Sequence, residues 1–174
     1  MGFGGAIKHN FRHYADFKGR AQRSQFWWWY LFLIVVQVVV SIIDSALGLQ
    51  IGGSTTDVTV GDTTIPLVDR GLGALQALLF LALVLPTLAV AVRRLHDTEH
   101  SGWWILSAVL LEVLGIVATI IAVAAGAGVA VLAILGIVFI GMAVLLVILL
   151  VFWVQKGTDG PNKYGPDPLG GSAA

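Results

Sequence analysis

The chain contains no cysteine and few charged residues. Without cysteine it can form no disulfide, no thiolate metal site and no cysteine nucleophile. Only 11% of the residues are charged, whereas 57% are hydrophobic and the mean hydropathy is +0.90. These values lie outside the usual balance of a water-soluble domain. The ten basic and ten acidic residues cancel, so the net charge gives no indication of a nucleic-acid partner.

Three long apolar blocks are each long enough to cross a bilayer. A hydrocarbon layer of roughly 30 Å takes about 20 helical residues, and lipid requires helices because backbone polar groups must be bonded internally. The third block is too long for one crossing, and its run Ala-Ala-Gly-Ala-Gly at 124–128 suits a reversal. We therefore predict four spans, over residues 27–49, 72–92, 103–124 and 129–154.

Lysine and arginine are concentrated on one side of these predicted spans. All but Arg70 lie in segment 1–26, in the loop after the second span, or in the tail 155–174. All six tryptophans flank the spans on that same side. Basic loops and interfacial tryptophans together place both termini in the cytoplasm. The predicted fold is an all-α integral membrane protein, a four-helix transmembrane bundle with cytoplasmic termini and a short irregular C-terminal tail.

The loop at 50–70 is predicted to lie on the outer side. Polar and β-branched residues alternate within it, which indicates a short hairpin around Gly61 and Asp62. Near the outer end of the first span, Asp44 is expected to pair with Arg70. The first span itself follows polar, basic residues and is longer than a signal-peptide core, so we interpret it as a retained anchor.

Polar residues beside the membrane gather in three segments. The first is GRAQR from Gly19, followed by FWWW; the second is RRLHD from Arg93, followed by SGWW from Ser101; the third is GTDGPNKYGPDP from Gly157. In this order, separated by apolar spans, the segments closely resemble the family called domain of unknown function 805. The resemblance covers about residues 17–168. It implies a multi-pass plasma-membrane protein of the bacterial inner membrane and no established activity.

The basic residues of these segments support two interpretations. In the favoured one, Arg93 and Arg94 are a stop-transfer pair held at the lipid headgroups. Asp97 pairs with one of them, and the tryptophans anchor the helix ends. In the other, basic side chains converge on an anionic ligand or lipid headgroup, because guanidinium groups bind phosphate bidentately. The candidate ligand-binding residues are Arg20, Arg23, Arg93, Arg94 and Lys163. The candidate collar and orienting residues are His96, Asp97, Trp103, Trp104, Asn162 and Tyr164.

A histidine beside a carboxylate, as at His96 and Asp97, is also found in catalytic bases and metal sites. No serine, cysteine or further histidine–carboxylate cluster stands at a recognisable spacing. We therefore predict no catalytic residue, no metal site and no cofactor, and we do not expect an enzyme.

Three polar residues fall at similar depth within the spans: Gln37, Thr87 and Glu112. Beside Thr87, Pro86 frees the carbonyl of Ala82 for another donor. The three polar residues are expected to form a buried cluster. In the favoured interpretation Glu112 is simply protonated or forms an interhelical hydrogen bond with Gln37, and the alternative is an ion or proton path.

Small residues recur every fourth position at Ala118, Ala122 and Gly126, which favours close helix packing. The partner helix is either the fourth span or a second copy of the chain. Three functions stay open: an interaction or scaffold protein of the envelope that contacts membrane lipids or a membrane protein, a solute or ion pathway, and a lipid-modifying enzyme. The first is favoured. A pathway requires a polar cavity reaching Glu112, and an enzyme requires His96, Asp97 and the arginines in one pocket.

Overall fold

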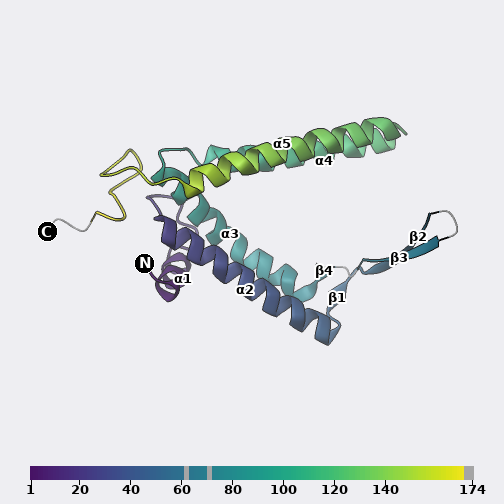
Figure 1. Ribbon diagram of the computed structural model, residues 1–174, viewed down its shortest axis with the longest axis horizontal. Coiled ribbons are helices and arrows are strands. Elements are labelled where there is room, and N and C mark those ends of the chain that lie inside the picture. The colour runs from purple at the N-terminus through teal and green to yellow at the C-terminus, as the bar shows by residue number, and fades with distance from the viewer. Residues whose placement is uncertain (61–62, 70–71, 171–174) are drawn as a thin grey trace.

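The computed structural model describes residues 1–60, 63–69 and 72–170 (Figure 1). Four of its helices are long and apolar enough to cross a membrane. The predicted all-α membrane fold with four spans is therefore confirmed, as is the irregular tail, which forms no helix or ladder strand over the described residues 155–170. The helices are α1 (Phe3–Arg12), α2 (Arg23–Leu47), α3 (Ala74–Asp97), α4 (Trp103–Ala124) and α5 (Gly128–Val154).

Helix α1 lies within the N-terminal segment that the sequence predicts only as polar and basic. Its phenylalanines pack by their edges against the start of α2. The ring of Phe3 lies 5.7 Å from that of Trp28, and the ring of Phe11 lies 5.3 Å from that of Trp29. The segment before the first span is thus attached to the spans rather than free of them.

Two antiparallel strand pairs connect α2 to α3. The longer pair is the predicted hairpin, which is confirmed, although its tip at Gly61 and Asp62 lies outside the described residues. The shorter pair joins the hairpin to the helix ends. The strands are β1 (Gln50–Ile51), β2 (Ser54–Val60), β3 (Thr63–Asp69) and β4 (Leu72–Gly73), paired β1 with β4 and β2 with β3.

The four long helices form two hairpins, α2 with α3 and α4 with α5, which diverge from a common end (Figure 1). We call this the collar end: α2 and α4 begin there, and α3 and α5 end there. The buried core is concentrated in it. Phe26, Trp29 and Leu95 are fully buried, and the ring of Trp153 from α5 lies 5.0 Å from that of Phe26. Aromatic packing therefore joins the two hairpins.

Glycine lets α4 and α5 approach closely. A Cβ atom at Gly115 would lie 2.5 Å from a methyl carbon of Val138 on α5. Ala122 is buried in this part of α4. Gly126, however, lies in the turn between the helices with φ of +69°, a conformation that favours glycine. The predicted pairing of the third and fourth spans is present, and its close approach is at Gly115, which lies outside the predicted ridge.

Asp44 caps the start of α3 from the end of α2. Its carboxylate accepts the backbone N–H of Leu75 at 3.1 Å and that of Gln76 at 2.9 Å. A free helix N-terminus leaves such donors unsatisfied, so the carboxylate fixes the two helix ends together. The expected partner Arg70 lies outside the described residues.

The carbonyl that Pro86 frees does find another donor. The hydroxyl of Tyr14 donates a hydrogen bond to the carbonyl of Ala82. The segment after α1 is thereby tied to the middle of α3. This contact satisfies a backbone group that the proline ring leaves without its helical partner.

Candidate functional site

Asp97, at the end of α3, is the centre of a buried ionic network at the collar end. Its carboxylate accepts the Nε of Arg20 at 2.9 Å and, on the other oxygen, an Nη of Arg94. Both guanidinium groups and the carboxylate are almost fully buried. The carboxylate therefore offsets two buried positive charges. Because burying charges away from water is costly, both guanidinium groups depend on this carboxylate as their partner.

Arg20 binds the tail as well as Asp97. Its two terminal nitrogens each donate at 2.6 Å to a backbone carbonyl, one of Thr158 and one of Gly160. The backbone N–H of Thr158 donates in turn to the carbonyl of Asp97 at 2.9 Å. The chain after α5 is thus held over the end of α3 by charge-assisted hydrogen bonds.

Arg94 joins the remaining helix ends to this network. Its Nε donates at 3.0 Å to the carbonyl of Trp153, and an Nη donates to that of Gln155. Another Nη lies 3.5 Å from the carbonyl of Ala21. These carbonyls belong to the end of α5 and to the segment before α2, so one guanidinium satisfies backbone groups of both.

Arg93 faces α1 instead. Its nitrogens approach the carbonyl of Ala89 at 3.3 Å, the side-chain oxygen of Asn10 at 3.1 Å and the Nε2 of His9 at 3.4 Å. The same oxygen of Asn10 accepts the amide of Gln25 at 2.8 Å. Arg93 therefore anchors α1 against α2 and α3.

The aromatic ring of Tyr164 in the tail stacks on His96. The two ring centroids are 3.9 Å apart and the planes differ by only 4°. Asn162 donates to the carbonyl of His96 and to the hydroxyl of Thr158, both at 3.0 Å. Four of the predicted collar residues are thus brought together, namely His96, Asp97, Asn162 and Tyr164.

The tail has a defined conformation of its own. Asn162 and Gly165 exchange two backbone hydrogen bonds of 3.0 Å, which closes a tight turn. The carboxylate of Asp167 accepts the backbone N–H of Leu169 at 2.8 Å and that of Gly160 at 3.1 Å. These hydrogen bonds lower the pKa of Asp167 below its ordinary value. A charged Asp167 therefore organises the chain that Arg20 holds.

Glycine is required where the tail crosses the network. A Cβ atom at Gly157 would lie 2.1 Å from a carboxylate oxygen of Asp97. No real side chain occupies such a distance, so the close approach of the tail depends on glycine.

The other predicted site residues lie outside this network. Arg23 and Lys163 are exposed, with the ammonium of Lys163 5.0 Å from the ring centre of Tyr164. Trp104 packs edge-on against Phe152, whereas Trp103 is 71% exposed.

The five predicted basic residues do not surround one open site, so an anionic ligand held by all five stays an untested prediction. Arg20, Arg93 and Arg94 are buried, and each guanidinium donates to several protein acceptors. The small cavity beside the network, about 70 Å³ in volume, is also lined by carboxylates of the tail. Of the predicted set, only Arg23 and Lys163 face outward.

The predicted buried polar cluster does not form. Gln37 and Thr87 line one cavity between α2 and α3, but Glu112 is exposed on α4 and does not line it. The reason is the divergence of the two hairpins, which separates residues of equal depth. The Nε1 of Trp29 donates to Thr87 at 3.1 Å.

Several residues of the network were missed in the sequence. Thr158 and Gly160 contribute backbone carbonyls to the network, and Gly157 lets the tail lie close to Asp97. Composition does not reveal either role. His9 and Asn10 had one available signal, since the phenylalanines of α1 recur at helical spacing around them.

The chain is similar to known bacterial membrane proteins. The family described as "Protein of unknown function (DUF805)" matches residues 14–166. "Inner membrane protein YhaI" of Escherichia coli strain K12 is 31% identical over 92% of each chain. "Inner membrane protein YhaH" of the same strain is 31% identical over 90% of each chain, and "Uncharacterized protein YiiR" is 28% identical over 87% of this chain and 84% of its own. No solved structure matches.

Proposed function

The chain belongs to the DUF805 family of inner-membrane proteins, and on that premise we propose that it is an interaction protein of the cell envelope. One observation carries the proposal: the buried arginines hold the tail as a preformed surface across the collar end. We propose further that this surface faces the cytoplasm, as the basic loops predict.

The chemistry at the collar end favours recognition over catalysis. The carboxylate of Asp97 is occupied by two guanidinium groups, so it is not free to act as a base or to orient His96. Glu112 lines neither the cavity between α2 and α3, nor the one beside the network, nor the one at His96 and Trp103. These features support a binding surface and favour neither an enzyme nor an ion pathway.

The outward side chains indicate which partner would fit. Lys163, Arg23 and Trp103 are exposed around the held tail. Cationic and aromatic side chains at a membrane surface suit the juxtamembrane segment of another membrane protein, with anionic headgroups as neighbours. If the partner is a second copy of the chain, the following experiment detects it as an adduct of twice the chain's mass.

A photo-crosslinking amino acid placed in living cells at Lys163 or Trp103 tests this proposal. Both positions are expected to give one discrete protein adduct of the same partner, and the adduct at Lys163 is expected to disappear when Asp97→Asn releases the tail. Phe80, which is 66% exposed but lies within α3, serves as the control position and should not give that adduct. Adducts with lipid alone at both collar positions would contradict the proposal.

A further inference from the structure

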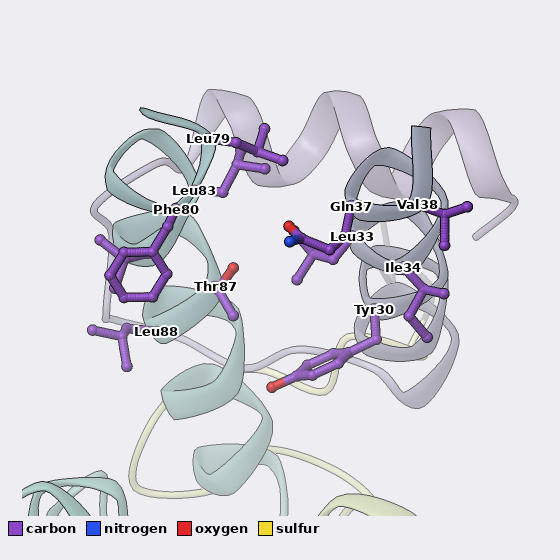
Figure 2. A pocket seen from close by; sticks show the side chains of 11 residues that line it. Tyr30, Leu33, Ile34, Gln37, Val38, Leu79, Phe80, Leu83, Thr87 and Leu88 are labelled. Carbon is purple, nitrogen blue, oxygen red and sulfur yellow. The ribbon is translucent and has the colours of Figure 1, made fainter. Parts of the chain in front are cut away.

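A cavity of about 460 Å³ lies between α2 and α3 (Figure 2). Its volume falls in the range of small-molecule sites, and most of its lining is aliphatic. Three polar side chains also line it, Tyr30 and Gln37 from α2 and Thr87 from α3. Figure 2 shows the amide of Gln37 and the hydroxyl of Thr87 directed toward the space between the helices.

The three polar groups share one hydrogen-bonding property: each has a proton to donate. The hydroxyl oxygen of Thr87 already accepts the indole N–H of Trp29 at 3.1 Å, which leaves its own proton free. Among the residues that the structure describes, none of the three groups donates to a protein acceptor. Unsatisfied hydrogen-bond donors are costly in a hydrocarbon environment. A bound molecule that carries a hydrogen-bond acceptor would therefore be stabilised in this cavity.

The cavity opens away from the protein. Ile34, Val38 and Phe80 on its lining are 59%, 54% and 66% exposed. Because α2 and α3 span the membrane, the surroundings of these side chains are bilayer hydrocarbon. An occupant of the cavity therefore enters from the bilayer.

We propose that this cavity binds a bilayer lipid whose apolar chain carries a carbonyl oxygen. The chain packs against the aliphatic lining, and the carbonyl accepts hydrogen bonds from Gln37 and from Tyr30 or Thr87. Two sources supply this chemistry, the acyl ester of a phospholipid and the ring of an isoprenoid quinone. The inference does not depend on the proposed interaction at the collar end, which lies on different residues.

Native mass spectrometry of protein released from nanodiscs tests the site. One set of nanodiscs contains phosphatidylethanolamine and phosphatidylglycerol, and a second set also contains an isoprenoid quinone. The double variant Gln37→Leu/Tyr30→Phe removes two donors while keeping an aromatic ring at Tyr30. Glu112→Leu makes a similar polar-to-apolar change on α4, outside the cavity, and is the matched control.

We expect the unmodified protein and Glu112→Leu to retain one lipid per chain, and the double variant to retain roughly tenfold less. An adduct of quinone mass in the second set alone would identify the quinone, and a phospholipid adduct in both sets would identify the ester. Equal retention in all three proteins, or no retained lipid in the unmodified protein, would overturn the proposal. So would a lipid-free dimer, which would assign the cavity to a helix of a second copy. Thr87→Val, a smaller change, repeats the test if the double variant unfolds.

Discussion

At the scale of single residues, the collar end depends on a contact between a carboxylate and a glycine. Asp97 balances two buried guanidinium groups, and Gly157 lets the tail backbone pass directly against it. The charges and the close approach are coupled, because a side chain at Gly157 would displace the carboxylate from its partners. The contact is local, but it joins α3 to a segment far along the chain.

Gly157→Ala is therefore expected to destabilise the protein by about 1–3 kcal/mol, the usual cost of overpacking at a close contact. The midpoint of thermal unfolding in detergent measures the effect. Gly128→Ala is the matched control, because a Cβ atom there meets no other atom within 4 Å. If both variants unfold at the same temperature, the close approach of the tail to Asp97 is not as described.

At the scale of elements, the spans follow from hydropathy alone. Helix α4 coincides with the predicted 103–124, and α5 begins one residue before the predicted 129–154, because apolar length and a glycine turn define them. Helices α2 and α3 extend beyond the predictions at the collar end. Polar residues such as Arg94 and Asp97 continue α3 there, since the tail and the other helix ends satisfy them.

The remaining features depend on contacts that are distant in sequence. Hydropathy identifies Arg94 as a basic residue beside a span, but not its backbone acceptors at Trp153 and Gln155. Equal depth suggested that Glu112 would meet Gln37, and the divergence of the hairpins separates them. Helix α1 was missed because basic residues mask its apolar face.

The docking of α1 is expected to depend on pH. Burial, followed by the charges of His13 and Arg93, lowers the pKa of His9 below its ordinary value of 6.5. The unfolded chain therefore binds this proton more readily than the folded one, so stability is highest above pH 6.5 and falls as the pH drops below it. Two further charged groups act on this pKa: Arg12 lowers it and Asp16 raises it.

His9→Gln is expected to lose less stability than the unmodified protein between about pH 7.5 and about pH 5.5. Thermal unfolding at the two pH values measures the difference. Lys8→Gln, an exposed position on the same helix, should keep the original pH dependence. An unchanged pH dependence in His9→Gln would show that this histidine does not contribute.

At the scale of the whole molecule, all four long helices meet at one end (Figure 1). The basic residues and tryptophans are concentrated at the helix ends that meet there. Because the chain has no cysteine, single cysteines report their side of the membrane without interference. In right-side-out vesicles, a membrane-impermeant maleimide is expected to label Gln50→Cys and not Lys163→Cys, and in inverted vesicles the reverse. Labelling of both on one side would contradict the proposed orientation.

The central claim is that one buried carboxylate, that of Asp97, positions the arginine that holds the tail against the helix ends. Asp97→Asn leaves two buried guanidinium groups without their countercharge, at an expected cost of about 3–5 kcal/mol. By contrast, Lys156 and Asp159 form an exposed pair of 2.8 Å, so Asp159→Asn is a control of the same chemistry at about 0–1 kcal/mol.

Amide hydrogen exchange of residues 155–170 in bilayer nanodiscs tests the claim most directly. In Asp97→Asn, the backbone N–H of Thr158 and neighbouring tail amides are expected to exchange much faster than in the unmodified protein, whereas the amides of α4 keep their exchange rates. In Asp159→Asn, the tail amides are expected to exchange as slowly as in the unmodified protein. Slow tail exchange that persists in Asp97→Asn would contradict the claim and would mean that other contacts hold the tail.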